Sequence, residues 1–177
     1  MRRYPAVAVV LLLSASSALA LDMPTRKAGL WELKMEFQGR NLPAQLMQQC
    51  TDASTDKLMT LNFGGAADRN CQKRDVRNNG GTITVDSVCS FGEATTTSHA
   101  VVSGDFNSAY TVQISSMRQG GRPTPGTAPG GESHMTISAK WLGPCVAGQK
   151  PGDVMMGNGM KMNVLDIQKM GGAPGRP

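Results

Sequence analysis

The sequence has few of the side chains from which active sites are built. It contains only two histidines, His99 and His134. It has no Gly-x-Ser-x-Gly turn, no His-Glu-x-x-His pair and no glycine-rich phosphate loop. Both histidines lie on the polar face of predicted strands, so a surface side chain without a function is the simplest interpretation of each. We therefore expect no catalytic residue and a protein that is not an enzyme. The alternative is a carboxylate pair that the sequence does not reveal.

Clustered basic residues and membrane-spanning apolar runs are also missing. The formal net charge is +5, but the lysines and arginines are scattered, with no run of three. Proteins that bind nucleic acid need such residues gathered on one face, so nucleic acid is not an expected partner. A membrane-spanning helix needs roughly 20 apolar residues, and no stretch after residue 20 approaches that length. We expect no transmembrane segment in the mature chain.

Residues 1–20 are typical of a cleavable secretory signal peptide. Two arginines near the start precede a short apolar run at residues 6–13, and Ala18 and Ala20 supply a small-residue cleavage site. The alternative is an uncleaved anchor, although the run is short for a membrane span. We therefore expect an exported chain whose mature form begins at Leu21.

Alternation of apolar and polar residues predicts a series of short strands. The first, residues 31–37, places Trp31, Leu33, Met35 and Phe37 on one face. Further strands are expected up to Cys50 and at residues 71–77, 82–90, 95–103, 109–117 and 134–141, with one short helix at 52–61 capped by Thr51 or Asp52. A Gly/Pro loop without strand or helix is expected at residues 119–131. The fold class is mainly β, bordering on α+β: a curved antiparallel β-meander sheet with one short helix and two disulfides.

The domain organisation follows from the same pattern. Residues 21–150 form a single β-rich domain. Residues 151–177 form a Gly- and Met-rich C-terminal tail that we expect to be partly disordered.

The Asn-Asn-Gly-Gly sequence at residues 78–81 predicts a hairpin turn. With a three-residue loop, Cys71 lies directly opposite Cys89, and Arg74 directly opposite Asp86. One register then supplies both a cysteine pair at bridging distance and an opposite-charge pair. This register predicts a Cys71–Cys89 disulfide. In the alternative, the hairpin forms but each cysteine bonds elsewhere.

The cysteines number only four, and none forms a Cys-x-x-Cys pair, which argues against a zinc or thioredoxin-like site. An even number in an exported chain predicts disulfides instead. With Cys71 bonded to Cys89, the second bridge joins Cys50 to Cys145. That bridge would link the first part of the sheet to its end.

A group of motifs resembles a family of exported bacterial proteins, the domain of unknown function 3617. The motifs are Gly-Leu-Trp-Glu at residues 29–32, a cysteine before a short helix, a cysteine at each outer end of a glycine-turned hairpin, and Gly-Pro-Cys at 143–145. The resemblance covers roughly residues 28–145. It implies a periplasmic, disulfide-bearing, β-rich domain and transfers no catalytic or binding residue.

By elimination, a non-catalytic binding or interaction module is the function that the sequence favours. A curved sheet with one apolar face can hold an apolar ligand or a cell-envelope protein. We expect an unfilled pocket near Trp31, Met35 or Trp141, and no cofactor. This inference rests on architecture rather than on a motif.

Copper is the alternative. Four methionines lie close together near the C-terminus: Met155, Met156, Met160 and Met162. Thioethers suit Cu(I), so these residues are candidate metal ligands. Methionine also fills irregular apolar gaps, and loose packing on the sheet explains the group equally simply.

Overall fold

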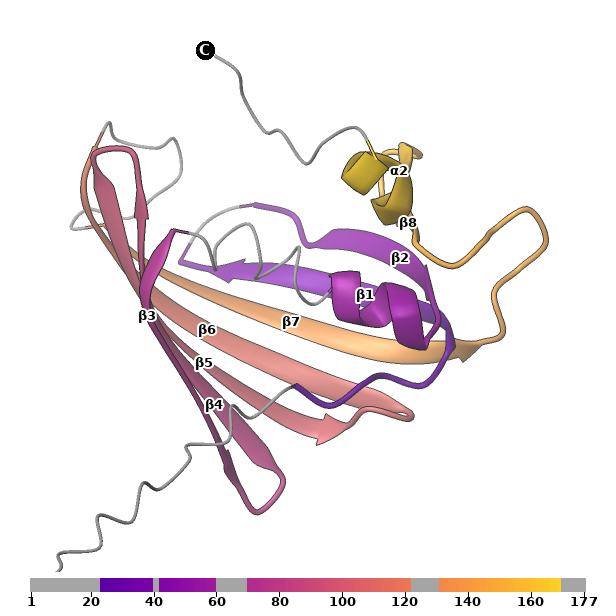
Figure 1. Cartoon of the computed structure of the whole chain (residues 1–177), viewed down its shortest axis with the longest axis horizontal. Helices are drawn as coiled ribbons and strands as arrows, with labels where there is room; N and C mark the ends of the chain where they lie inside the picture. The colour runs from indigo at the N-terminus through magenta and orange to yellow at the C-terminus, as the bar shows by residue number, and fades with distance from the viewer. Residues whose placement is uncertain (1–22, 40–41, 60–69, 122–130, 170–177) are drawn as a thin grey trace, which may run out of the picture.

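The structure, a computed structural model, describes residues 23–39, 42–59, 70–121 and 131–169. The strands of this part are β1 (Gly29–Gln38), β2 (Gln45–Thr51), β3 (Cys71–Asn79), β4 (Thr82–Phe91), β5 (Ala94–Asp105), β6 (Ala109–Gly120), β7 (Glu132–Gly143), β8 (Asp153–Met156) and β9 (Lys161–Asn163). They form one antiparallel sheet in the order β3-β4-β5-β6-β7-β1-β2-β8-β9 (Figure 1). The structure therefore confirms a mainly β fold built on an open antiparallel sheet.

The N-terminal strands lie in the interior of the sheet. Strands β3 to β7 follow one another as a meander, and β1 then pairs with β7 on one side and with β2 on the other. The start of β1 requires glycine. Gly29 has a φ of +133°, and a Cβ atom there would lie 2.3 Å from the carbonyl oxygen of Gly143. Other residues tolerate neither this backbone conformation nor this contact.

The β3–β4 hairpin has the expected Cys71–Cys89 disulfide, but its register differs from the prediction. The turn contains only residues 80–81, so the strands pair one residue more tightly than a three-residue loop allows. A bulge in β3 just after Cys71 shifts the register back by one residue, so that Cys71 lies opposite Cys89. The predicted pairing of Arg74 with Asp86 is therefore wrong, because Arg74 lies opposite a serine.

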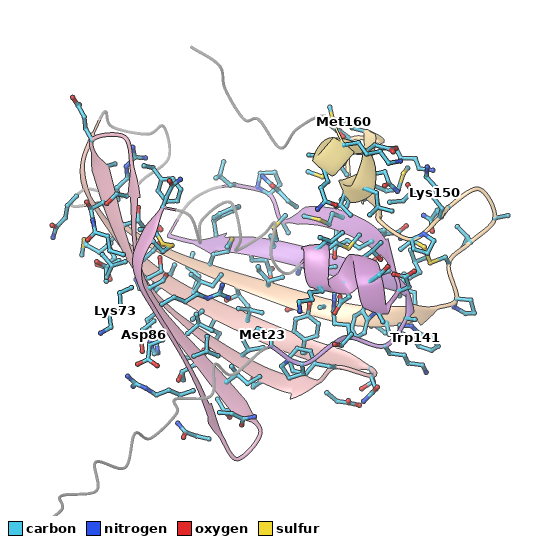
Figure 2. The ribbon with its side chains drawn as sticks, in the orientation of Figure 1. Met23, Lys73, Asp86, Trp141, Lys150 and Met160 are labelled. Carbon is cyan, nitrogen blue, oxygen red and sulfur yellow. A yellow bond between two sulfur atoms is a disulfide. The ribbon has the colours of Figure 1, made fainter. Side chains whose placement is uncertain are left out.

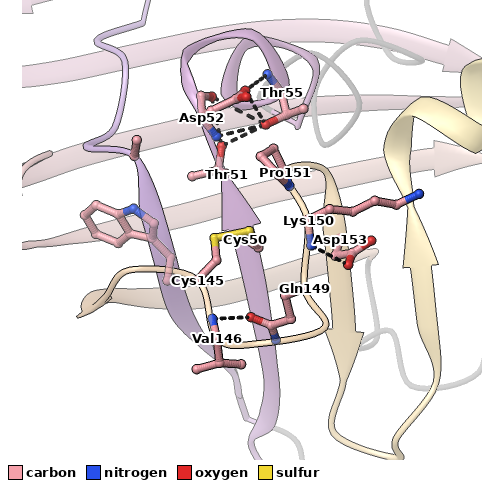
Figure 3. The surroundings of a disulfide bond; sticks show 12 residues. Cys50, Thr51, Asp52, Thr55, Cys145, Val146, Gln149, Lys150, Pro151 and Asp153 are labelled. Atoms are coloured by element: carbon pink, nitrogen blue, oxygen red, sulfur yellow. Dashed lines mark hydrogen bonds between the residues drawn. A yellow bond between two sulfur atoms is a disulfide. The ribbon is translucent and has the colours of Figure 1, made fainter.

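The second disulfide, Cys50–Cys145, joins the end of β2 to the segment after β7 (Figure 3). Cys50 is almost fully buried, and its carbonyl oxygen accepts a hydrogen bond from the Gly152 N–H at 2.8 Å. The bridge therefore lies where the chain returns to the sheet to form β8. Both bridges are those expected from the hairpin.

The segment after residue 150 continues the sheet in its described part. β8 pairs with β2 and with β9, and α2 (Val164–Lys169) follows. Asp153, at the start of β8, is 1% exposed. Burial alone would raise its pKa, but hydrogen bonds from Asn163 and Lys161 lower it. The expected boundary at residue 150 is thus not a boundary of the sheet.

The predicted helix is present at residues 53–59. Asp52 caps it, because its Oδ1 atom accepts hydrogen bonds from the backbone N–H groups of Thr55 at 2.8 Å and Ser54 at 3.1 Å. The bond from Thr55, with further bonds from Ser54, lowers the pKa of the Asp52 carboxyl. Residues 60–61 of the predicted helix lie outside the described part.

The core lies between this helix and one face of the sheet. Its buried members include Trp31, Leu33, Met47 and Met59, with Val154 from β8. The alternation predicted for β1 therefore selects the core face correctly. No helix in the described residues is long and apolar enough to cross a membrane.

Two other expectations fall partly or wholly on residues that are not described. The signal peptide expected at residues 1–20 lies wholly outside the described part. Of the predicted Gly/Pro loop, residues 122–130 lie outside it. β6 extends to Gly120, so the first two residues of that predicted loop belong to a strand.

Candidate functional site

The core-facing side of the sheet contains a cavity of about 440 Å³. Ligand pockets usually measure roughly 300–1,000 Å³, so the cavity is large enough for a small molecule. Its walls come from strands β1 to β7, with the helix at 53–59 and N-terminal residues that include Met23 (Figure 2). Most of the lining is apolar.

In-register rows of side chains form the apolar wall. Successive strands contribute the first row, which consists of Val102, Val112, Ile137 and Met35. The neighbouring row contains Val85, Ala100 and Ile114. Ala100 is the smallest of these side chains, and it leaves space between two larger neighbours. These two rows form the sheet side of the cavity.

One end of the cavity, which we call the closed end, contains a buried ion pair. The Nε atom of Arg26 lies 2.6 Å from Oδ1 of Asp56, and the Arg26 backbone N–H donates to Oδ2 at 2.9 Å. Arg26 is 7% exposed and Asp56 is 2% exposed. The Arg26 Nη1 atom also donates to the side-chain oxygen of Gln49 at 2.9 Å. The two charges neutralise each other inside the protein, and three groups share one network.

Tyr110 completes the closed end. Its hydroxyl lies 3.5 Å from Nη1 of Arg26, and its ring stacks on Phe106 with centroids 4.9 Å apart. Burial raises the pKa of Tyr110, against the smaller opposing effect of the Arg26 charge. The hydroxyl therefore keeps its proton at neutral pH and is available as a hydrogen-bond donor.

The other end of the cavity, the open end, is lined by hydroxyl groups. Ser87 pairs with Ser98, Ser98 with Ser116, and Ser116 with Ser133, so four adjacent strands carry serine at the same level. Ser87 and Ser98 line the cavity and are half-buried. Phe91, at this same end, is 48% exposed, so this end is the more accessible to solvent.

Both histidines lie on the opposite face of the sheet, as their polar phase predicts. His99 Nδ1 lies 2.7 Å from Oδ1 of Asp86, and this hydrogen bond lowers the pKa of that carboxyl. His134 lies 3.1 Å from the Ser115 hydroxyl and 3.0 Å from Glu132. Asp86, labelled in Figure 2, therefore pairs with a histidine rather than with an arginine.

The serine, histidine and carboxylate groups of this outer face line a second hollow of about 360 Å³, which includes Asp86, His99 and Glu132. The histidine and carboxylate side chains are exposed to solvent, and the strands that carry these groups, β4 to β7, pair along their length. Backbone N–H groups in such a ladder already have acceptors and are not available to stabilise an oxyanion. The arrangement consists of hydrogen-bonded pairs, His99 with Asp86 on one side and His134 with Ser115 and Glu132 on the other.

The four methionines do not share one site. Met155 pairs with Lys161 on one face of the β8–β9 hairpin, whereas Met162 pairs with Val154 on the other. Met156 lies on the same face as Val154 and packs against the core. Met160, beside α2 in Figure 2, is 56% exposed. No cluster of three His, Cys, Asp or Glu residues able to hold a metal ion occurs in the described residues.

The pocket expected near Trp31, Met35 or Trp141 lies beside Met35. Trp31 is fully buried in the core, and the Trp141 ring lies 3.6 Å from the Lys27 ammonium group. The alternation of polar and apolar residues identifies neither end of the cavity. Arg26 belongs to the lead-in before β1, and no local pattern relates it to a carboxylate thirty positions away.

A family model described as "Protein of unknown function (DUF3617)" matches residues 26–145. The match begins at the arginine of the closed end and ends at the cysteine after β7. No curated protein and no solved structure matches the chain.

Proposed function

We propose that this chain, which belongs to the DUF3617 family of proteins of unknown function, is an exported, non-catalytic binding module that holds an apolar ligand in its cavity. The observation that carries the proposal is a space of about 440 Å³ with mostly apolar walls on the core side of the sheet. Burial of apolar ligand surface in such a space is favourable by about 25 cal/mol per Å². The open end gives the ligand a route of entry.

A fluorescent apolar probe tests this proposal. N-phenylnaphthylamine is uncharged and becomes fluorescent when it leaves water. The purified mature protein should bind it, and Ala100→Phe should abolish binding by filling the cavity from β5. Val101→Phe is the matched control, because the neighbouring residue of the same strand faces the opposite side of the sheet. Equal binding by the two variants would refute the cavity as the binding site.

Export and ligand identity are tested on protein from its own cells. Intact-mass analysis of a periplasmic fraction should give a chain beginning at Leu21, as the cleavage site predicts. Native mass spectrometry of the same preparation should show a bound apolar molecule, and its mass identifies the ligand. Recovery of the uncleaved chain, only in membranes, would contradict the exported form.

Binding of Cu(I) is a second candidate function, favoured by one observation. Met156 and Met162 lie on the same face of the β8–β9 hairpin, and Met160 directly precedes β9. Substitution is the better test than deletion, because β8 pairs with β2. Met160→Leu and Met162→Leu together should weaken Cu(I) retention against a competing chelator. Met155→Leu, on the other face, is the control.

A further inference from the structure

We propose that the ligand is an uncharged apolar molecule with a carbonyl group, and that this carbonyl lies at the closed end, where it accepts a hydrogen bond from the Tyr110 hydroxyl. The inference rests on the proposed function and adds the chemical class and the orientation of the ligand. The balance of hydrogen-bond donors and acceptors at the closed end carries it.

The oxygen acceptors of the closed end are already in use. Arg26, Gln49 and Tyr110 line the cavity there. Both carboxylate oxygens of Asp56 accept from Arg26, one from its Nε atom at 2.6 Å and the other from its backbone N–H at 2.9 Å. The side-chain oxygen of Gln49 accepts from Nη1 of the same arginine at 2.9 Å. Every carboxylate and amide oxygen of this network therefore has a donor.

Two donors of the same network face sulfur instead of oxygen. Nη2 of Arg26 lies 3.8 Å from the sulfur of Met59. Nε2 of Gln49 lies 3.4 Å from the sulfur of Met47. In the described part of the chain neither nitrogen has an oxygen acceptor. A thioether is a weak acceptor, so two buried N–H groups have poor partners.

The Tyr110 hydroxyl is a third donor, and none of the described residues accepts its proton. Its oxygen lies 3.5 Å from Nη1 of Arg26, which donates to it, so the O–H bond points elsewhere. Ring contacts with Phe106 and Trp31, with centroids 4.9 Å and 5.6 Å away, hold the tyrosine ring in place. The closed end therefore presents a positioned donor to the cavity.

This surplus of donors selects an uncharged acceptor. The charge of Asp56 already balances that of Arg26, so a ligand carboxylate would bring an uncompensated negative charge into the interior. A ligand hydroxyl or amine would bring further donors to a place where the oxygen acceptors are in use. A carbonyl oxygen accepts hydrogen bonds and donates none, so it fits this end of the cavity.

The apolar part of the ligand has a wall to lie against. Beyond Tyr110, the same face of β6 continues with Val112 and Ile114, and both line the cavity. Tyr110 and Ile114 are four residues apart in this strand, which corresponds to about 13 Å. With a volume of about 440 Å³, the cavity suits a single small molecule whose carbonyl lies at one end.

Three probes that share a phenyl ring and a chain of the same length test the polar group. They are benzylacetone, which is a ketone, butylbenzene, which is a hydrocarbon, and phenylbutyrate, which is a carboxylate. Each is titrated against the mature protein by displacement of N-phenylnaphthylamine. The ketone should bind at least about tenfold more tightly than the carboxylate, whose charge has no counter-charge left at the closed end. Equal binding of these two probes would overturn the inference.

Tyr110→Phe removes the donor and keeps the ring. It should weaken binding of benzylacetone about fivefold, the effect of one lost hydrogen bond between uncharged groups, and leave binding of butylbenzene unchanged. Ser98→Ala is the matched control, because it removes a hydroxyl from the open end of the same cavity, and it should change neither. An equal effect of Tyr110→Phe on the two probes, or a loss of ketone binding in Ser98→Ala alone, would overturn the inference.

Carbon-13 NMR of benzylacetone labelled at its carbonyl tests the hydrogen bond in the native chain. A carbonyl carbon resonates further downfield when its oxygen accepts a hydrogen bond than it does in an alkane solvent. The bound ketone should show this downfield shift, and Tyr110→Phe should remove it. An alkane-like resonance in the native chain would overturn the inference while leaving the apolar cavity intact. Failure of every probe to bind, N-phenylnaphthylamine included, would instead refute the proposed function.

Discussion

Breaking the buried ion pair at the closed end should greatly lower the free energy of unfolding, and replacing both partners should restore most of it. Replacing Arg26 by methionine removes the guanidinium and leaves the Asp56 carboxylate, which is 2% exposed, with one remaining hydrogen bond from the backbone N–H of residue 26. Breaking a buried pair in this way costs about 3–5 kcal/mol. The side-chain oxygen of Gln49 loses its donor as well, which adds about 1 kcal/mol. Because the backbone bond survives, we expect a total loss of about 4 kcal/mol.

The double variant Arg26→Met/Asp56→Leu should recover most of this loss, since an apolar pair of similar volume avoids the desolvation of both charges. Urea unfolding followed by circular dichroism measures the free energy of unfolding of each variant. The control is Lys34→Met, which breaks the exposed Lys34–Glu36 pair and should cost less than about 1 kcal/mol. The reasoning fails if Arg26→Met behaves like this control, or if the double variant is no more stable than the single one.

Three further predictions concern stability and use the same urea assay. Replacing Cys50 and Cys145 together by alanine should cost about 4.7 kcal/mol by the chain-entropy relation, because the bridge spans 95 residues; a loss below about 1 kcal/mol would contradict that account. Asp153→Asn should be about 2 kcal/mol less stable than the native chain at neutral pH. Burial raises the pKa of Asp153, but its hydrogen bonds outweigh this effect and lower the pKa below 3.8. The native chain should therefore lose its stability advantage over Asp153→Asn as the pH falls through this lowered pKa. Gly29→Ala should cost at least about 2 kcal/mol, since its φ is +133° and a Cβ atom would meet the Gly143 carbonyl; a neutral effect would show that this junction can shift.

Local chemistry made much of the fold predictable. The Asn-Asn-Gly-Gly turn at residues 78–81 and the alternation on either side of it define a hairpin within a short stretch of chain. The position of Cys71 opposite Cys89 follows from that turn. The tighter turn shifts the register by one residue, and the bulge after Cys71 shifts it back, so this pairing is kept. The Asp52 cap is equally local, since its partners are two and three residues away.

The C-terminal strands were not predictable in the same way. Residues 153–156 and 161–163 are strands of only four and three residues, too short to give a period-two signal. They are strands because the free edge of β2 supplies hydrogen-bond partners, and because the Cys50–Cys145 bridge brings the chain back to that edge. The sequence therefore indicated the bridge but not the structure that forms beside it.

The cavity depends on tertiary structure for a simple reason: each of its features combines residues from distant positions. Arg26 meets Asp56 across thirty residues, and Ser87 and Ser98 each look like an ordinary polar residue within a strand. Sequence by itself determined the strand alternation and the disulfide framework, because these depend on near neighbours or on cysteine number. Only the pairing of strands from both ends of the chain decided where charge, hydroxyl groups and empty space come together, because strand register sets which side chains share a face and how far apart they lie.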